Sequence, residues 1–169
     1  MAERILVVDD EKSIREALSK VLRAEHYDVL SAETGHDAME RYKTGRIDLL
    51  LLDLNLTGGN GWATLDWLAR VNPLLPVVII TGRANQRALA EKSGADALME
   101  KPLNVPLLLQ TIRELLDEPM ECRAARAKRR PSSFRFVSCD EQLLREELNE
   151  RFTVPFLPRE RAPQAGGRD

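Results

Sequence analysis

The sequence predicts an α/β fold in which five strand–helix units form a doubly wound, five-stranded parallel sheet of the (βα)5 type. Segments of strand and helix character alternate five times along the first 118 residues. Three of the strand segments contain continuous apolar runs, as expected for strands that helices cover on both faces of a parallel sheet. Successive strands start about 20–30 residues apart, which leaves room for one helix in each interval.

The strands are expected, in order, at residues 5–8, 28–32, 47–52, 77–81 and 97–100. Amphipathic stretches fill the intervals, with apolar side chains at the three- and four-residue spacing of a helix face. These stretches centre on residues 14–22, 38–42, 62–68, 88–92 and 105–116. The fourth helix is expected to end at Gly94, because glycine accepts the left-handed conformation that often closes a helix. Asn104 precedes the fifth and is expected to cap its amino end.

The charge of the chain changes sign near residue 118. Residues 1–118 hold 14 Lys and Arg against 19 Asp and Glu, whereas residues 119–169 hold 11 against 8. We therefore expect a domain over residues 1–118 followed by a C-terminal extension. The extension is divided into a basic linker (119–139), a short acidic helix (140–152) and a tail (153–169). Three prolines and two glycines predict no fixed structure for that tail.

Cysteine use and hydropathy indicate a cytoplasmic protein. Cys122 and Cys139 are too far apart for a C-x-x-C site, and their small number suits a reducing compartment. No apolar stretch approaches the ~20 residues that cross a bilayer, and the N-terminus shows no secretory signal pattern. We expect no contact with a membrane.

Charged and hydroxyl side chains stand at the carboxyl ends of four predicted strands. Asp9 and Asp10 follow the first, Asp53 the third, Thr81 closes the fourth and Lys101 follows the fifth. In an open α/β sheet the ligand site lies beyond these ends. A single Asp there is often a helix cap, but caps do not explain all five residues together. Three converging carboxylates would repel one another without a cation, and hard oxygen ligands favour Mg²⁺.

These positions resemble the motifs of the response-regulator receiver family, also called CheY-like. The resemblance covers residue 5 to about residue 118. The motifs read Val7-Val8-Asp9-Asp10-Glu11, Leu50-Leu51-Leu52-Asp53-Leu54, Ile79-Ile80-Thr81-Gly82 and Lys101-Pro102. The resemblance implies a five-stranded sheet in the order 2-1-3-4-5 and a receiver domain over residues 1–118.

The resemblance also implies a role for each site residue. Asp53 would be the phosphoacceptor, and Thr81 and Lys101 would contact the phosphoryl oxygens. Mg²⁺ would be held by Asp9, Asp10, Asp53 and the backbone carbonyl of Asn55. By the same resemblance the Lys101-Pro102 peptide would be cis. A carboxylate is a weak nucleophile, but it can form an acyl phosphate when a metal and an ammonium group neutralise the incoming charge.

The implied function is that of a response regulator in a two-component or phosphorelay pathway. The donor would be a phosphohistidine on a histidine kinase or a histidine phosphotransfer protein. The chain would be a phosphoacceptor with self-dephosphorylation at most, rather than an enzyme. Its partners would be that donor, a downstream protein and a second copy bound through the fourth and fifth helices.

Three positions depart from the family pattern. Thr57 stands where the family usually has Pro, so the loop over residues 57–61 is expected to be more mobile than usual. Leu98 replaces an aromatic residue that moves inward in the family when the hydroxyl at position 81 engages the phosphoryl group. Arg83 and Asn55 lie where side chains in this family gate the access of water to the acyl phosphate. Arg83, for this reason, and Leu98, for the missing aromatic ring, are candidate modulators.

Other functions explain the same residues less well. A phosphatase of the haloacid-dehalogenase type would need an acid at position 55, where Asn55 stands. A dinucleotide site would need G-x-G-x-x-G in the turn that begins at Asp10. The alternative that stays open is a regulator whose basic tail binds nucleic acid through the run at residues 123–130. A receiver whose output no longer depends on phosphate is a third reading.

We favour output through protein contact. The predicted helix at 140–152 is acidic, and duplex DNA would repel it. All four phenylalanines lie in the extension, which predicts that it docks on the domain or on a partner: Phe134, Phe136, Phe152 and Phe156.

Overall fold

A computed structural model of the chain describes residues 2–57, 61–128 and 134–137. Its centre is a six-stranded sheet in the order β2-β1-β3-β4-β5-β6, in which every neighbouring pair is parallel. The strands are β1 (Arg4–Val8), β2 (Asp28–Ala32), β3 (Leu49–Asp53), β4 (Val77–Thr81), β5 (Ala97–Glu100) and β6 (Arg135–Val137). The predicted fold class and the order of the first five strands are confirmed.

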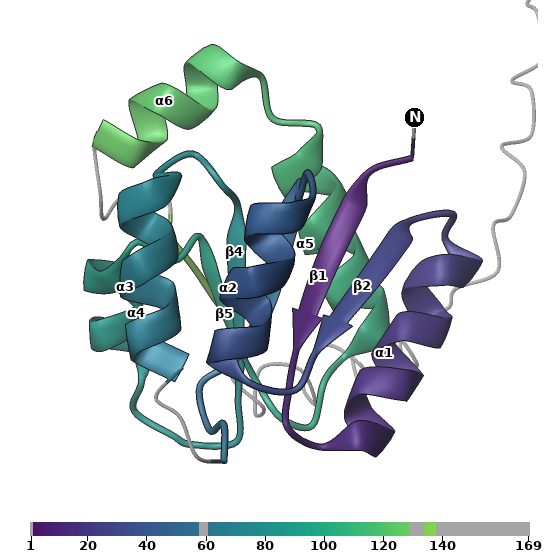
Figure 1. Cartoon of the computed structure of the whole chain (residues 1–169). Coiled ribbons are helices and arrows are strands. Elements are labelled where there is room, and N and C mark those ends of the chain that lie inside the picture. The colour runs from purple at the N-terminus through teal and green to yellow at the C-terminus, as the bar shows by residue number, and fades with distance from the viewer. Residues whose placement is uncertain (1, 58–60, 129–133, 138–169) are drawn as a thin grey trace, which may run out of the picture.

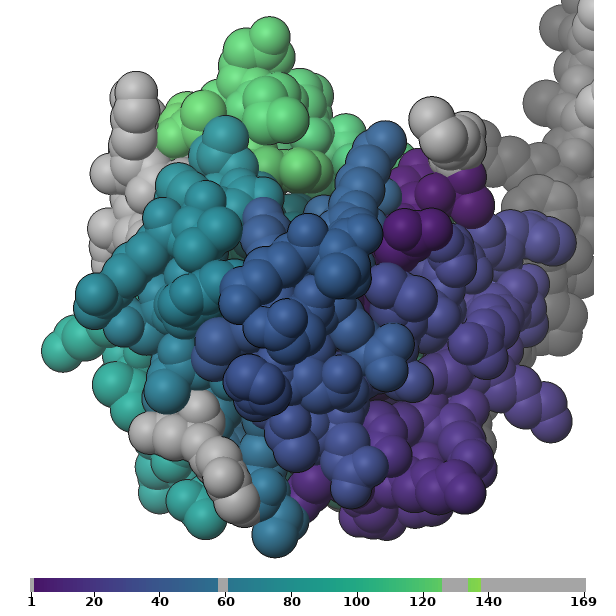
Figure 2. All heavy atoms as spheres, viewed as in Figure 1, coloured from purple at the N-terminus to yellow at the C-terminus, as the bar shows by residue number. Residues whose placement is uncertain are grey.

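Helices cover both faces of the sheet (Figure 1). One face packs on α1 (Lys12–Ala24) and α5 (Val105–Leu116). The other face packs on α2 (Gly35–Thr44), α3 (Gly61–Val71) and α4 (Arg87–Ser93). In the space-filling view from the same side, the atoms of α2 and α3 form a continuous surface over this second face (Figure 2).

The core consists of two layers, because successive side chains of a strand point to opposite faces. In β3, Leu50 and Leu52 lie in the layer under α2, α3 and α4, whereas Leu49 and Leu51 lie in the layer under α1 and α5. All four are fully buried. This two-sided burial explains why the strand is an unbroken leucine run instead of an alternating one.

The sequence located the elements within a few residues. β3 begins at Leu49 rather than at residue 47 and ends at Asp53. Asp48 lies just before β3, and its carboxylate accepts hydrogen bonds from the backbone N–H of Arg4 and from the Arg46 guanidinium. Asn104 caps α5 by accepting a hydrogen bond from the Leu107 N–H, as predicted.

Gly94 closes α4 in the left-handed conformation, with φ of 99°, as the sequence predicts. Both histidines, His26 and His36, are exposed. Trp62 and Trp67 are partly buried against the core, and Trp67 meets Tyr42 edge to face.

Two elements lie inside the segment predicted to be a basic linker. Helix α6 (Met120–Lys128) lies beyond the amino ends of the strands, at the end of the sheet opposite to Asp53 (Figure 1). It is tied there by the Arg123 guanidinium, which donates to the Leu115 carbonyl at 2.8 Å. Strand β6 adds a sixth strand that the sequence did not predict, because three residues are too short to show a period. The predicted helix at 140–152 and the tail at 153–169 lie outside the described residues.

Within the described part of the chain, no helix combines the length and the apolar character needed to cross a membrane.

Candidate functional site

The predicted acidic residues meet at the carboxyl ends of β1 and β3. Carboxylate oxygens of Asp9, Asp10 and Asp53 all lie within 4.8 Å of one another. Asp9 and Asp53 are buried, at 2% and 3% exposure, and Asp10 is half-buried. The convergence follows from the parallel pairing of β1 with β3, which places Val8 beside Leu52 and the next residues of both strands at one edge.

Lys101 joins two of these carboxylates. Its ammonium lies 3.0 Å from Asp9 Oδ2 and 2.7 Å from Asp53 Oδ2. The lysine follows β5, and its backbone N–H donates to the Thr81 carbonyl at 2.8 Å. The Lys101-Pro102 peptide is cis, as the resemblance implied. Lys101 is therefore held by its backbone, and its side chain reaches back across β4 to the acidic residues.

Backbone N–H groups take the second oxygen of the same two carboxylates. The Glu11 N–H donates to Asp9 Oδ1 at 2.8 Å, and the Asn55 N–H donates to Asp53 Oδ1 at 2.7 Å. Asp9 and Asp53 are thus each fixed between a loop N–H and the Lys101 ammonium. Such charge-assisted hydrogen bonds compensate for the burial of the carboxylates.

The electrostatics of the group follow from burial and from these contacts. Burial raises the pKa of Asp9 above its ordinary value, against the hydrogen bonds from Lys101 and from the Glu11 N–H. Burial alone would lower the pKa of Lys101, but the hydrogen bonds to Asp53 and Asp9 outweigh it and hold that pKa above its ordinary value. Lys101 therefore stays charged.

Asp10 is held by Thr57, a residue for which the sequence predicted no contact. Asp10 Oδ2 accepts hydrogen bonds from the Thr57 hydroxyl and from the Thr57 N–H, the latter at 2.9 Å. The hydroxyl is the main reason that the pKa of Asp10 lies below its ordinary value. The two residues are 47 positions apart, so no local pattern could reveal the contact. Of the loop expected to be mobile, residues 58–60 lie outside the described residues, and Gly61 is the first residue of α3.

Thr81 lies at the end of β4, next to the end of β3. It is fully buried, and its hydroxyl oxygen accepts a hydrogen bond from the Arg83 N–H at 3.0 Å. The register of β3 and β4 pairs Asp53 with Ile80, so Thr81 is one residue beyond the phosphoacceptor candidate. The bond from the Arg83 N–H uses the hydroxyl oxygen as acceptor, so it does not use the hydroxyl hydrogen.

The two modulator candidates lie in different environments. The Arg83 side chain is exposed in the loop after β4. Leu98 is fully buried in β5, in the layer that faces α4, and pairs in register with Phe136 of β6. Asn55 lies beside the site, and its side-chain oxygen is buried without a hydrogen-bond partner among the described residues.

Two further residues support the site, and sequence reasoning missed both roles. Arg15 on α1 donates from its guanidinium to the Asp9 carbonyl at 2.7 Å, which anchors the turn before the helix. Gly61, the first residue of α3, lies against the backbone of β3. A methyl group on it would come within 2.8 Å of the Asp53 carbonyl oxygen and 2.7 Å of the Leu54 Cα. The first contact joins residues six positions apart and the second requires the folded backbone, and the strand and helix periodicity of the sequence indicates neither.

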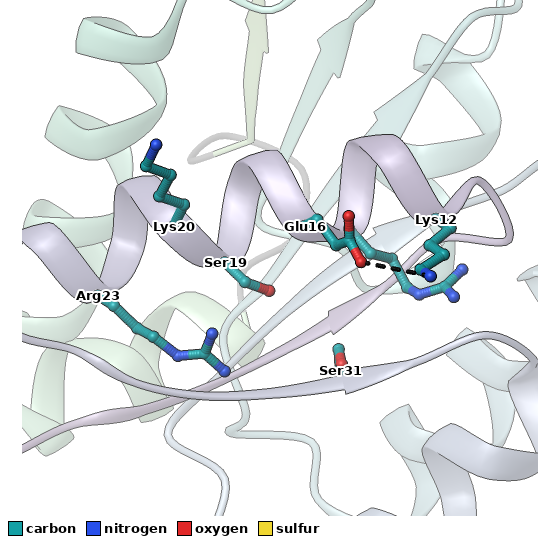
Figure 3. Close-up of a pocket in the computed structure, with 7 residues that line it drawn as sticks. Lys12, Glu16, Ser19, Lys20, Arg23 and Ser31 are labelled. Carbon is teal, nitrogen blue, oxygen red and sulfur yellow. Dashed lines mark ion pairs between the residues drawn. The ribbon is translucent and has the colours of Figure 1, made fainter.

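A second hollow, a groove of about 540 Å³, lies between α1 and β2 (Figure 3). It is lined by Lys12, Arg15, Glu16, Ser19, Lys20, Arg23 and Ser31. Three of its cations already bind protein oxygens: Lys12 pairs with Glu16, Arg15 with Glu33 and Arg23 with the Val29 carbonyl. The groove is the polar side of α1 above the edge of the sheet, and we assign no ligand to it.

Comparisons with known proteins agree with this architecture. DNA-binding response regulator MtrA of Mycobacterium tuberculosis is 38% identical over 127 residues, which are 72% of this chain and 55% of MtrA. A CheY-like response regulator receiver domain protein from Methanospirillum hungatei is 30% identical, with a TM-score of 0.67 over 69% of this chain and 95% of that one. Response regulator TrrA from Thermotoga maritima, solved with Mg²⁺ and BeF, is 30% identical, with a TM-score of 0.63 over 67% and 98%.

The chain spans between 28% and 56% of the length of the curated relatives it matches. Residues 5–113 match the model of the response regulator receiver domain family. That range contains the carboxyl end of every strand that carries a residue of the acidic site. The chain therefore belongs to the response regulator receiver domain family.

Proposed function

We propose that the chain is a response regulator that accepts a phosphoryl group on Asp53 from a histidine kinase or a histidine phosphotransfer protein. One observation carries this proposal: the Asp53 carboxylate is buried, beside two further carboxylates, with its oxygens fixed by the Lys101 ammonium and the Asn55 N–H. A fixed carboxylate next to a cation is suited to attack phosphorus, because phosphoryl transfer depends mainly on positioning and charge compensation.

The site fits Mg²⁺. The three carboxylates have oxygens within 4.8 Å of one another, and together with the Lys101 ammonium they leave a net charge of two negative units, which a divalent cation balances. The side-chain oxygen of Asn55 is in addition buried without a hydrogen-bond partner among the described residues, so a polar group beside the site is left for a ligand. The ligands would be Asp9, Asp10, Asp53 and the backbone carbonyl of Asn55. When bound, the metal supplies charge compensation for the phosphoryl oxygens.

The side chains of this protein divide the remaining work. A carboxylate oxygen of Asp53 attacks phosphorus, the phosphorus–nitrogen bond of the donor phosphohistidine breaks, and the leaving imidazole keeps the electron pair of that bond. Lys101 compensates the charge on the phosphoryl oxygens, and the Thr81 hydroxyl donates a hydrogen bond to one of them. TrrA, which is 30% identical, was solved with Mg²⁺ and BeF, and this supports the proposal.

The chain acts as an acceptor rather than as an enzyme on another substrate. Asn55 cannot supply or remove a proton, so no side chain at position 55 acts as a general acid or base on the acyl phosphate. We expect loss of the phosphoryl group to be a slow attack by water, with Asn55 and Arg83 controlling access.

The assignment of Asp53 is tested with a small-molecule phosphodonor and Mg²⁺, with intact mass as the readout. The native chain and the control Asp66→Asn, an exposed carboxylate paired with Arg70 on α3, should both gain one phosphoryl group. Asp53→Asn should gain none. A base-labile phosphoryl group that forms on Asp53→Asn at the native rate would remove Asp53 from its role.

We propose a cytoplasmic location and output through contact with a downstream protein. A second candidate output, binding of nucleic acid by the basic run at 123–130, is favoured by the DNA-binding relative MtrA. The two are separated by titrating the chain with duplex DNA at physiological salt, since weak phosphate contacts are lost there. A salt-resistant complex that disappears in Arg129→Glu/Arg130→Glu would favour the second candidate.

A further inference from the structure

Asp10 is held in the acidic site differently from the other two carboxylates. Asp9 and Asp53 are each fixed between a loop N–H and the Lys101 ammonium. The hydrogen bonds that another described residue donates to the Asp10 carboxylate both come from Thr57, one from the hydroxyl and one from the backbone N–H at 2.9 Å. The position of Asp10 in the site therefore depends on Thr57.

These bonds join the carboxyl ends of two neighbouring strands. Asp10 is the second residue after β1, and Thr57 is the fourth residue after β3, which pairs with β1 in parallel. Because the two strands end at the same edge of the sheet, residues 47 positions apart in the sequence meet there. The contact ties the start of the connection between β3 and α3 to the end of β1.

The contact keeps Asp10 within the site and leaves one of its oxygens for a ligand. Both bonds from Thr57 end on Oδ2, so neither uses Oδ1. In this arrangement a carboxylate oxygen of Asp10 lies within 4.8 Å of oxygens of Asp9 and Asp53. Thr57 therefore holds Asp10 inside the group of three carboxylates that would bind Mg²⁺, instead of drawing it away from them.

The hydroxyl of Thr57 is the stronger of the two donors in its effect on Asp10. It is the first cause of the lowered pKa of that carboxyl, ahead of the Thr57 N–H. Proline, the usual residue of the receiver family at this position, has no backbone N–H and no hydroxyl. Thr57 thus gives this chain a hold on Asp10 that the usual residue would not give.

We propose that Thr57 is a positioning residue for Asp10, and that it raises the Mg²⁺ affinity of the site by fixing this ligand before the ion binds. A half-buried Asp side chain without such a partner samples several rotamers, and this freedom is lost when an ion is bound. Hydrogen bonds that orient a metal ligand contribute about 10–100-fold to metal affinity. The inference rests on the Mg²⁺ site of the proposed function.

The same contact should favour Mg²⁺ over the larger Ca²⁺. Mg²⁺ needs a near-ideal octahedral arrangement of oxygens, whereas Ca²⁺ accepts a variable number of oxygens in a flexible arrangement. A ligand that is free to turn therefore costs more affinity for Mg²⁺ than for Ca²⁺. Loss of the Thr57 hydroxyl should weaken the binding of both ions, and that of Mg²⁺ by the larger factor.

Metal titrations of the full-length chain test the inference, with thermal unfolding at a series of Mg²⁺ or Ca²⁺ concentrations giving each dissociation constant. Thr57→Val keeps the β-branched shape and the N–H but removes the hydroxyl. It should raise the dissociation constant for Mg²⁺ by about tenfold and that for Ca²⁺ by less. Thr57→Ser keeps the hydroxyl and should bind Mg²⁺ as tightly as the native chain.

A matched control is Thr44→Val, which removes an exposed hydroxyl that donates to the Arg41 carbonyl in α2 and should leave both dissociation constants unchanged. Each constant is obtained from the shift relative to the same variant in a chelator. A change in metal-free stability therefore does not enter the comparison.

The outcomes separate this inference from the proposed function. A native chain whose unfolding temperature does not depend on Mg²⁺ overturns the proposed metal site, and this inference with it. A native chain that binds Mg²⁺, with Thr57→Val binding it equally or more tightly, overturns the inference alone. Equal losses for Mg²⁺ and Ca²⁺, or a Thr57→Ser chain as weak as Thr57→Val, also overturn it, because the hydroxyl would then not act by positioning Asp10.

Discussion

At the scale of single residues, the site is organised around Lys101. Its ammonium is the cation that both Asp9 and Asp53 contact, at 3.0 and 2.7 Å. Because both carboxylates are buried, the energy of the site depends on this one positive charge when no metal is bound. The same charge later compensates the phosphoryl oxygens, so one side chain serves the resting state and the proposed reaction.

Removing that charge should destabilise the chain most when no metal is present. For Lys101→Met in the presence of a metal chelator, we expect the free energy of unfolding to fall by about 1–3 kcal/mol. This loss is smaller than that for breaking a fully buried ion pair, because the Lys101 side chain is 23% exposed. Mg²⁺ should restore part of the loss. Urea unfolding measures both, with Lys20→Met on the exposed side of α1 as the control. An equal loss with and without Mg²⁺ would contradict this.

At the scale of elements, the site depends on how closely α3 approaches the end of β3. Gly61 begins α3 against the backbone of Asp53 and Leu54, at a distance that a side chain would not allow. Gly82, after β4, has open space around it. These two glycines flank the same site but differ in what surrounds them.

The two glycines therefore form a matched pair of variants. Gly61→Ala should lose about 1–3 kcal/mol of stability and slow the phosphorylation of Asp53, because backbone must move to admit the methyl group. Gly82→Ala should stay within about 1 kcal/mol of the native chain. Urea unfolding and the rate of mass gain measure the two effects. Similar losses in both variants would show that the close contact of α3 with β3 does not matter.

At the scale of the whole molecule, the acidic domain carries its excess negative charge partly in one pocket. A ligand that binds the folded chain and not the unfolded chain raises stability by mass action. The acidic pocket forms only when β1, β3 and β5 come together, so a metal bound there should stabilise the whole fold.

The metal prediction follows directly. A Mg²⁺ concentration one hundred times its dissociation constant should raise the free energy of unfolding by about 2.7 kcal/mol. Asp10→Asn should lose most of that gain, while Asp66→Asn should keep it. Thermal or urea unfolding with Mg²⁺ against a chelator gives the comparison. Equal Mg²⁺ stabilisation in the Asp10→Asn chain would place the ion elsewhere.

Local sequence determined the order of the elements and the identity of the acidic residues. Leu49–Leu52 runs straight into Asp53, and Asn104 precedes an apolar helix face, so short windows were enough to predict a strand, its terminal carboxylate and a helix cap. The convergence of Asp9, Asp10 and Asp53 followed from the rule that parallel strands end at the same edge. Periodicity and strand ends carry this information because they depend on neighbours a few residues apart.

The tertiary structure decided which groups touch. Lys101 donates a hydrogen bond to Asp53, 48 residues away in the sequence, and Thr57 donates one to Asp10, 47 residues away. Gly61 lies against the backbone at the end of β3. Strand β6 is the largest such case, because three residues have no period of their own and pair only where the edge of β5 offers unpaired backbone groups. Contacts of this kind depend on the assembled sheet, and no segment of the sequence contains them.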